Sequence, residues 1–235
     1  TYAVYGPLIT STRTIFVNSL NALQNPKCLE LFLEATKPSF FYSSVTLLRA
    51  IRSIAKITNF KKINKQNLNI IGIGSCGEPL ADEVGKWAIN FFSTKNKHIV
   101  NTYFQTETGG IMVAPKEEDG IPPDYSSVGK PSKEIGLFIA KDKFTKLELE
   151  EEEINPDEIL IENPWNGIYK KVKSDRNVNY FTKKGYFRFN DVGYFDQNGF
   201  LYIGGRSDDV INTAGHRISS SEIESTCMYL EEIKE

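Results

Sequence analysis

Apolar residues recur at about the helical period in three segments of the first hundred residues. One segment begins at Pro26 and ends before Lys37-Pro38, and two more run from Leu47 to Ala55 and from Leu80 to Phe92. Because this spacing puts the apolar side chains on one face, it predicts three amphipathic helices. The opening stretch, Tyr2 to Phe16, is apolar with an early Gly-Pro pair, and there a helix and a pair of strands both remain open.

Short runs rich in aromatic and β-branched residues separate these helices. They predict buried strands at Phe40–Val45, Leu68–Ile73 and Ile99–Val100, with a turn at Gly74–Pro79. Helices that alternate with strands indicate an α/β fold with a layered sheet.

The second half of the chain is richer in strands and loops. Residues 115–131 carry many Pro, Asp, Gly and Ser and predict connecting chain. Leu147 to Glu153 is an acidic run that we interpret as a solvated surface insertion. A last helix is expected from near Ser219, because Ser221 and Glu224 form a capping box. Strands are predicted at Ile135–Ala140, Glu158–Ile161 and Phe200–Ile203, the last entered through the hairpin signal Gln197-Asn198-Gly199.

Composition narrows the classes of partner. The chain has 235 residues, 25% of them charged, and a formal net charge of −2, which favours neither nucleic acid nor an anionic membrane. No apolar run is long enough to span a membrane. Protein partners are left unknown.

Cysteine and histidine usage argues against disulfides and metal clusters. Cys28, Cys76 and Cys227 are odd in number and far apart, and His98 and His216 are isolated. This pattern fits neither a disulfide framework nor a zinc site, so we expect a reducing compartment, the cytoplasm, with a nuclear or organellar pool as the alternative. The chain opens without Met or a signal pattern, so we expect a fragment of a longer protein.

The first stretch with candidate chemistry runs from Thr102 to Gly110 and reads Thr-Tyr-Phe-Gln-Thr-Glu-Thr-Gly-Gly. It is too polar for a buried strand and lacks an apolar stripe, so it predicts a loop. Hydroxyls can hold phosphate oxygens, a carboxylate can hold Mg²⁺, and glycines let a ligand approach the backbone. A purely structural loop remains the alternative.

A second stretch, Ser75 to Pro79, follows a predicted strand directly. Ligands of open α/β sheets bind outside the carboxyl ends of the strands, so this stretch and Thr102–Gly110 can face one crevice. A simple strand-to-helix turn is the alternative.

The third stretch lies between Asp191 and Arg217. Arg206 stands beside the adjacent carboxylates Asp208 and Asp209, a pairing that an ordinary turn does not require. A carboxylate can bind a ribose diol, and arginines bind ribose or phosphate through forked hydrogen bonds. Salt-bridged surface arginines are the alternative.

Taken together and in this order, the three stretches resemble one family. The chain is similar to the adenylate-forming acyl-CoA synthetases, most closely the short-chain branch typified by acetyl-CoA synthetase. The resemblance covers nearly the whole chain and is carried by Tyr5-Gly6-Pro7-Leu8, Gly77-Glu78-Pro79, Gln105-Thr106-Glu107-Thr108-Gly109-Gly110, Gly205-Arg206-Ser207-Asp208-Asp209-Val210-Ile211-Asn212, Gly215-His216-Arg217 and Glu222-Ile223-Glu224.

The resemblance implies a two-step ligase that uses ATP, Mg²⁺ and coenzyme A. A carboxylate attacks the α-phosphate of ATP to give an acyl-adenylate and pyrophosphate, and the thiol of coenzyme A then displaces AMP. It also implies the sites. Residues expected to bind ATP or AMP are Gly77, Glu78, Pro79, Asn101, Thr102, Tyr103, Phe104, Gln105, Thr106, Asp191, Arg206 and Arg217.

Particular roles follow from the same resemblance. Thr106, Glu107 and Arg217 are the expected catalytic residues, with Thr106 on the α-phosphate, Glu107 on Mg²⁺ and Arg217 near the phosphate. Asp191 is expected to bind the ribose hydroxyls. Asp208 matches the hinge of the C-terminal lid domain, and coenzyme A is expected near Asn21, Ala214 and Gly215.

The acyl pocket is expected at Cys76 and Phe104. Phe104 stands where the acetate enzymes hold a tryptophan that excludes longer acids. Phenylalanine is smaller but still bulky, so we predict acetate ahead of propionate. A core aromatic without a role in the pocket is the alternative.

The family pattern also implies an architecture. We expect an α/β subdomain over residues 1–110, a β-rich, barrel-like subdomain over residues 111–207, and the hinge and start of a small α+β lid over residues 208–235.

Four departures from the family stand out. The Gly/Ser/Thr/Lys-rich phosphate loop and the lysine of the C-terminal domain are absent from this sequence, so the chain alone is not expected to complete the reaction. Phe189-Asn190-Asp191 replaces Thr-Gly-Asp, and Tyr125–Gly129 replaces a loop that carries another glycine. Two alternatives stay open: an adenylate-forming ligase for another acyl or amino acid, and an inactive nucleotide-binding module.

Overall fold

The computed structural model describes residues 2–17, 23–63, 68–94, 99–120, 122, 124–168, 180–209, 211–213, 216–218, 223, 226 and 227, and the statements below concern these. They form two compact units. The first contains the described residues up to 102 together with 124–126. The second contains those from 103 to 122 and from 127 onward. Each unit is described by itself.

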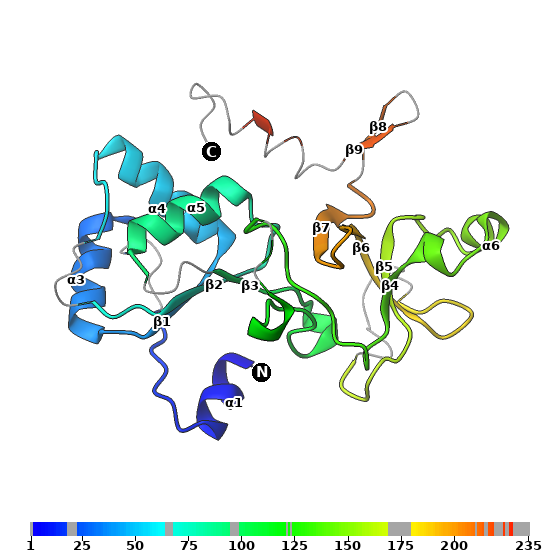
Figure 1. Cartoon of the computed structure of the whole chain (residues 1–235), viewed down its shortest axis with the longest axis horizontal. Coiled ribbons are helices and arrows are strands. Elements are labelled where there is room, and N and C mark those ends of the chain that lie inside the picture. Colours follow the sequence, from blue (N-terminus) through cyan, green and yellow to red (C-terminus); the bar gives the residue numbers. More distant parts are fainter. Residues whose placement is uncertain are drawn as a thin grey trace. The chain divides into compact units, whose positions relative to one another are not determined.

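The first unit is built on a parallel sheet in the order β1-β2-β3 (Figure 1). Its strands are β1 (Phe40–Ser44), β2 (Gly72–Cys76) and β3 (Ile99–Asn101). Its helices are α1 (Tyr2–Ile9), α3 (Pro26–Thr36), α4 (Val45–Ile57) and α5 (Asp82–Phe92). Helices alternate with parallel strands, which confirms the predicted α/β fold.

Local sequence explains where the helices begin and end. Asn25 accepts hydrogen bonds from the backbone of Lys27 and Cys28 and so caps α3, which Pro26 opens. The helix ends at Lys37, whose left-handed backbone (φ 46°) stops further helical bonding. Ser44 caps α4 by accepting from Leu47 N–H at 3.2 Å. The three predicted helices are therefore confirmed, the third starting at Asp82 rather than Leu80.

The predicted position of the second strand is wrong by several residues. β2 begins at Gly72 instead of Leu68 and includes Gly74, which we had predicted to start a turn. The reason lies across the sheet, where Phe40 pairs with Gly72 and Tyr42 with Gly74. A β-carbon at Gly74 would collide with the Tyr42 ring, so glycine lets the aromatic side chain lie over the neighbouring strand.

The core of the first unit lies between the sheet and its helices. Helices α4 and α5 pack side by side (Figure 1) and turn apolar faces inward. Ring stacking reinforces the contact, since Phe41 of β1 lies 5.0 Å from Phe92 of α5 between ring centroids. The largest wholly buried side chains among the described residues of this unit are Leu29, Leu33, Leu48, Ile51, Ile63, Ile73, Leu80, Phe91 and Phe92.

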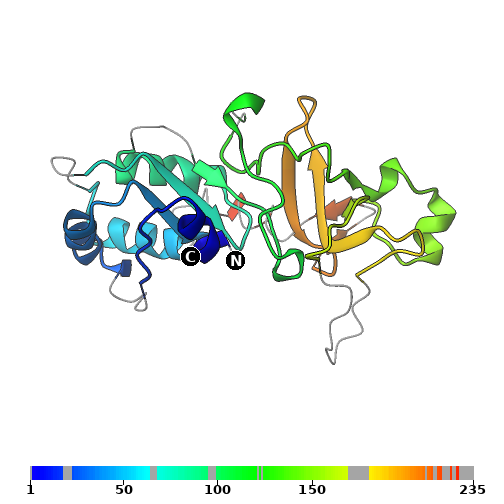
Figure 2. The ribbon, with the colours of Figure 1, turned by 90° about the horizontal axis from the view of Figure 1, so that it is seen from below.

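The second unit is dominated by an antiparallel sheet in the order β4-β5-β6-β7. Its strands are β4 (Leu137–Ile139), β5 (Glu158–Ile161), β6 (Phe187–Phe195) and β7 (Leu201–Arg206). Figure 2 shows β6 and β7 as the yellow-to-orange hairpin. The turn at Asp196–Gly199 joins them, as predicted, because Asp196 accepts from Asn198 and Phe200 N–H.

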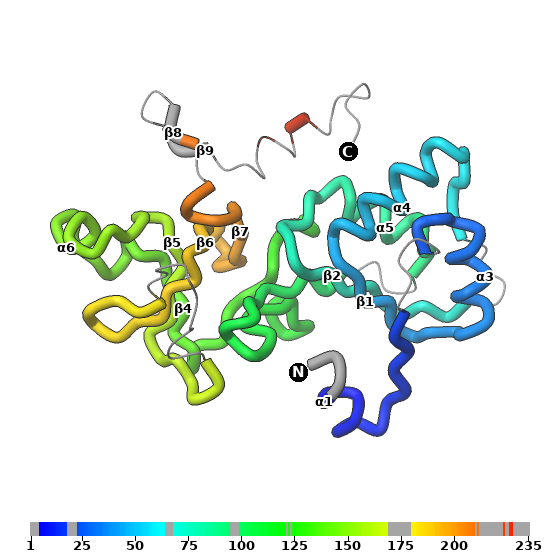
Figure 3. Tube along the Cα trace, turned by 180° about the vertical axis from the view of Figure 1, so that it is seen from behind, coloured from blue at the N-terminus to red at the C-terminus, as the bar shows by residue number. Residues whose placement is uncertain are grey.

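Two expectations for this unit need correction. β6, the longest of the described strands, is missing from the prediction, because its alternation of apolar and polar residues breaks at Asp191. The described strands form an open sheet, so the barrel-like closure is not seen among them. The acidic run, predicted as a solvated surface insertion, contains helix α6 (Lys146–Glu151; Figure 3), which Thr145 caps and buried Leu149 anchors, while Leu147 and Glu150 are exposed.

Short elements complete the unit. Three short 3₁₀ helices are described, η1 (Thr106–Thr108), η2 (Glu117–Asp119) and η3 (Ala140–Asp142). Strand β8 (Ile211–Thr213) pairs with β9 (His216–Ile218). The helix predicted from Ser219 lies mostly outside the described residues. The boundaries predicted at residues 110 and 207 stay predictions.

Candidate active site

The second unit holds a buried carboxylate at the centre of a polar cluster. Asp191 lies on β6 opposite Arg206 of β7 and is 7% exposed. Its Oδ2 accepts from the Tyr103 hydroxyl at 2.8 Å and from Gln105 Nε2 at 2.7 Å. Its Oδ1 accepts from Arg206 Nη1 at 3.3 Å. The structure thus brings together four residues that the sequence assigned to the nucleotide.

Backbone geometry explains why these donors converge. Tyr103 bridges to Val113, donating its N–H to the Val113 carbonyl at 2.8 Å, and its ring lies 5.1 Å from that of Phe189. Gln105 immediately precedes η1, where its own N–H bonds Thr108 Oγ1 at 3.1 Å. Gln105 Nε2 and Arg206 Nη1 also donate to the Phe189 carbonyl, at 2.8 and 3.2 Å. One carbonyl of β6 therefore helps to hold both donors.

Electrostatics in the cluster follow from burial. Burial raises the pKa of Asp191 above its ordinary value, while the bonds from Tyr103 and Gln105 and the charge of Arg206 oppose that shift. Burial also raises the pKa of Tyr103 well above its usual range, and the nearby carboxylate adds to this, so the phenol stays protonated and donates. Partial burial alone would lower the pKa of Arg206, but Asp191 and Asp208 raise it.

The departure at Asn190 has a conformational explanation. Asn190 stands where the family usually has glycine, and its φ is +54°. This left-handed conformation suits glycine, and asparagine tolerates it better than most other residues. The substitution therefore keeps the backbone shape that presents Asp191.

The predicted metal ligand has a partner that the sequence did not reveal. Glu107 lies in η1 between Thr106, which is exposed, and buried Thr108. The Tyr180 hydroxyl donates to Glu107 Oε1 at 3.0 Å. Mg²⁺ usually takes one or two protein carboxylates and completes its shell with water and substrate phosphates, so Glu107 beside a threonine hydroxyl fits that ion.

Residues 76–79 belong to the first unit, at the end of β2. Cys76 lies at the strand end, with its thiol 3.7 Å from the Ser43 carbonyl oxygen. Gly77 has a φ of +91° and starts the turn. Glu78 accepts from Thr46 Oγ1 at 2.7 Å and lies 3.7 Å from Arg49 Nη1, so helix α4 holds this carboxylate. Pro79 follows, half-buried.

Asn101 and Thr102 also lie in the first unit and are buried. Asn101 accepts from the Ser75 hydroxyl at 3.1 Å and donates to the Ser126 carbonyl at 3.1 Å. Thr102 Oγ1 donates to the Ser75 carbonyl at 2.7 Å and lies 2.6 Å from the Tyr42 hydroxyl. Their side chains are therefore hydrogen-bonded to Ser75, Tyr42 and Ser126 around the end of the sheet.

The structure describes only some of the remaining predicted site residues. Phe104 is half-buried and packs against the core of the second unit, which is compatible with both readings of its role. Asp208 is exposed and lies 3.4 Å from Arg206 Nε. Arg217 pairs with Asn212 between β9 and β8, and nothing is described of its side chain. Asn21, Ala214 and Gly215 lie outside the described residues.

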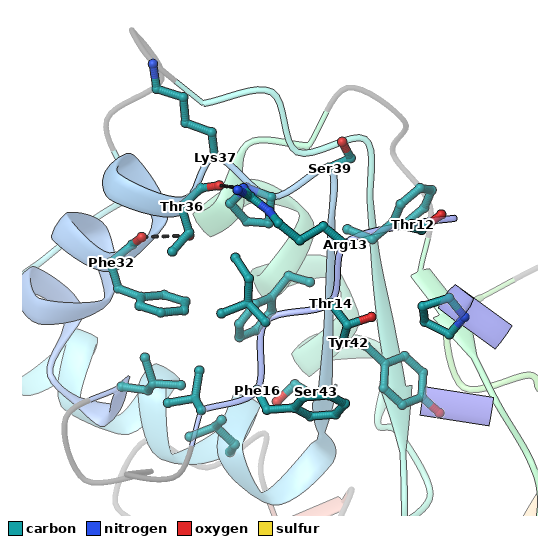
Figure 4. Close-up of a pocket in the computed structure, with 18 of the residues that line it drawn as sticks. Thr12, Arg13, Thr14, Phe16, Phe32, Thr36, Lys37, Ser39, Tyr42 and Ser43 are labelled. Carbon is teal, nitrogen blue, oxygen red and sulfur yellow. Dashed lines mark hydrogen bonds between the residues drawn. The ribbon is translucent and has the colours of Figure 1, made fainter. Parts of the chain in front are cut away.

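The first unit also contains a cavity of about 750 Å³, which Figure 4 shows. Its walls are largely apolar, with Phe16, Phe32 and Tyr42 among them. At its rim Arg13 donates to the Thr36 carbonyl at 3.2 Å. None of the predicted site residues lines it.

Two features are absent from the described residues. No helix in the described part of the chain has the length and apolar character to cross a membrane. The described residues also contain no group of three or more His, Cys, Asp or Glu side chains arranged to hold a metal ion.

Residues missed by sequence reasoning are joined to the site by tertiary contacts. Tyr180 contacts Glu107 across 73 positions, and Tyr42 contacts Thr102 across 60. Neither stands in a motif or at an informative spacing. A local pattern cannot report contacts between residues so far apart along the chain.

Solved structures define the class of fold. The chain is similar to a benzoate CoA ligase from Burkholderia xenovorans, with a TM-score of 0.70 and 18% identity over 97% of this chain and 42% of that one. It is also similar to an anthranilate CoA ligase solved with anthranoyl-AMP, with a TM-score of 0.68 and 18% identity over 95% of this chain and 40% of that one. These likenesses show the fold of adenylate-forming ligases.

The family follows from sequence. Residues 1–166 match the model of the AMP-binding enzymes, and the chain belongs to that family. It is 29% identical over its whole length to an acetyl-coenzyme A synthetase of Magnetococcus marinus and 31% identical to acetyl-coenzyme A synthetase 2 of Candida glabrata. It spans 36% and 34% of those relatives' lengths, about a third. The resemblance found in the sequence is thereby confirmed.

Proposed function

We propose that this chain contributes to a ligase that activates acetate, with propionate second, and passes the acyl group to coenzyme A. In the first step a carboxylate oxygen bonds the α-phosphorus of ATP while the bond to pyrophosphate breaks. In the second step the thiol of coenzyme A attacks the acyl carbonyl, loses its proton and displaces AMP. The overall products are acyl-CoA, AMP and pyrophosphate.

The observation that carries the proposal is the cluster around Asp191. A buried carboxylate held by fixed donors is suited to accept hydrogen bonds from a ribose diol. It lies in the same unit as Thr106 and Glu107, which supply a hydroxyl for phosphate and a carboxylate for a cation. When bound, Mg²⁺ would neutralise phosphate charge during the displacement. The residue proposed to bind the ribose and those proposed to act on the phosphates therefore lie in the same unit.

The choice of acid rests on Phe104 and on the relatives. The similar curated proteins are named acetyl-coenzyme A synthetases, which supports acetate. The similar structures are named for benzoate and anthranilate, so another acid remains the second candidate within the ligase class. A bulky aromatic at position 104 favours a small acid, because it fills space that a longer chain needs.

The test is carboxylate-dependent ATP–pyrophosphate exchange, measured on the protein expressed with whatever flanking segments its gene encodes. Acetate, propionate, butyrate, benzoate and a set of amino acids would be compared. Fastest exchange with acetate supports the proposal. Exchange with only a larger acid or an amino acid changes the substrate class, and no exchange from a folded protein that binds AMP indicates an inactive nucleotide-binding module.

A substitution series tests the pocket. Phe104→Gly should shift the preference toward longer acids by about tenfold or more, because an apolar pocket gains roughly 1–3 kcal/mol per added methylene that it can hold. Phe104→Trp is the matched variant and should reduce exchange with propionate relative to acetate. An unchanged order of acids in both variants would remove Phe104 from the pocket.

A further inference from the structure

We infer that Tyr103 and Gln105 act on the nucleotide through Asp191, as positioning residues that fix its carboxylate to accept a ribose hydroxyl. They would thereby set the preference for ribonucleotides over deoxyribonucleotides. The inference rests on the proposed function, since it concerns the nucleotide site of the same ligase. It changes the expectation from the sequence, in which both residues contact the nucleotide themselves.

The geometry assigns the two oxygens of Asp191 different tasks. Oδ2 accepts two short bonds, 2.8 Å from Tyr103 and 2.7 Å from Gln105, which occupy its two lone pairs. Oδ1 accepts from Arg206 at 3.3 Å, a longer bond, and Arg206 also bonds the Phe189 carbonyl. Among the described residues, Oδ1 is therefore the oxygen with acceptor capacity left for a ligand.

Both donors are themselves held in place. The Tyr103 backbone is paired with Val113, and its side chain is 7% exposed. Gln105 Nε2 is shared between Asp191 and the Phe189 carbonyl at 2.8 Å. Neither polar group needs to move when a ligand arrives, so together they fix the rotation of the carboxylate before binding. A group ordered in advance loses less entropy on binding.

Burial makes the orientation of the Asp191 carboxylate depend on these two donors. Asp191 has little access to water, so its orientation is set by protein donors and not by solvent. Hydrogen bonds to a charged group are stronger than neutral ones, and losing one donor should loosen the carboxylate measurably. A ribose hydroxyl that depends on Oδ1 would sense that change, whereas adenine and phosphate would not.

The experiment compares three ligands by isothermal titration: AMP, 2′-deoxy-AMP and 3′-deoxy-AMP. The proteins are the wild type, Tyr103→Phe and Gln105→Met, each expressed with its encoded flanking segments. Tyr103→Phe keeps the ring against Phe189 and removes only the hydroxyl. Tyr186→Phe is the matched control, because this ring packs in the separate cluster of Phe138 and Phe144.

We expect the wild type to bind AMP at least tenfold more tightly than one of the deoxy nucleotides. Tyr103→Phe and Gln105→Met should each weaken AMP binding about tenfold while changing the affinity for that deoxy nucleotide less than twofold. The preference for the ribose hydroxyl should thus collapse in both variants and stay intact in Tyr186→Phe. Unfolding midpoints within a few degrees of wild type would show that the site is still folded.

Equal losses for AMP and the deoxy nucleotides would overturn the inference, because that is the result of direct contact or of a structural role. Unchanged affinities in both variants would overturn it as well, and Gln105→Met decides the matter if Tyr103→Phe does not fold. A wild type that binds no AMP would instead refute the proposed function, an outcome distinct from the other two.

Discussion

The ion pair between Glu158 and Arg188 offers a stringent test of how the second unit is held together. Arg188 Nε donates to Glu158 Oε1 at 2.8 Å and Nη2 donates to Oε2 at 2.9 Å. The two bonds form a bidentate salt bridge between β5 and β6. Glu158 is fully buried and Arg188 is 7% exposed. Arg188 also donates to the Glu153 carbonyl at 3.2 Å. Arg188 lies three residues before Asp191 on β6.

Glu158→Gln should destabilise the second unit by about 3–5 kcal/mol. The substitution keeps the size of the side chain but leaves a buried guanidinium without its counter-charge, and this is the typical cost of breaking such a pair. Two charge-assisted bonds of about 1.5–3 kcal/mol each give a similar figure. Replacing both partners, as in Glu158→Leu with Arg188→Met, should recover much of the loss, because no unpaired charge remains.

Urea unfolding followed by tryptophan fluorescence would measure the change. The chain has two tryptophans, Trp87 in the first unit and Trp165 in the second, so a Trp87→Phe background reports on the second unit alone. Asp157→Asn is the matched control, since its pair with Lys141 spans 2.8 Å between exposed side chains and should contribute less than about 1 kcal/mol. The reasoning fails if Glu158→Gln costs no more than the control, or if the double variant is as unstable as the sum of its single changes.

Two further predictions concern the site. Tyr180→Phe keeps the ring that stacks on Phe187 but removes the hydroxyl bonded to Glu107. The Mg²⁺ concentration for half-maximal ATP binding should therefore rise about tenfold, while metal-free AMP affinity stays the same, and an equal loss of both would exclude this role. Because burial raises the pKa of Asp191 in the folded state above 3.8, wild-type stability carries a component that falls as the pH rises through that raised pKa. The stability of Asp191→Asn relative to wild type should thus increase between pH 4 and pH 7 in urea unfolding, and a difference that does not change with pH would contradict it.

Much of the architecture could be predicted from local patterns. An opening proline, a periodic apolar face and a stop at Lys37-Pro38 predict the helix from Pro26 to Thr36, and all three lie within one stretch of sequence. The hairpin turn at Asp196–Gly199 is equally local, because Asp196 bonds residues two and four positions on. The motif residues were found for a similar reason, since their types and order are visible without a structure.

The strands that were missed or misplaced from the sequence share a different cause. β6 alternates apolar and polar residues only from Phe187 to Asn190, and the pattern breaks at Asp191, where the buried strand carries a carboxylate. Its full extent is set only when β5 and β7 pair with it. β2 begins late because the aromatic rings of β1 need glycines opposite them, which is a requirement of the partner strand and not of β2 itself.

The division between sequence and tertiary structure is clearest at the site. By itself the sequence determined the family, the ends of the helix from Pro26 to Thr36, the hairpin turn and the chemical types available for a nucleotide, since these depend on residues close together in the chain. Only the tertiary structure decided that Tyr103, Gln105 and Arg206 all bond one buried carboxylate and that Tyr180 bonds Glu107. Those contacts join residues 15 to 88 positions apart, and their geometry depends on strand pairing and burial, which no local pattern encodes.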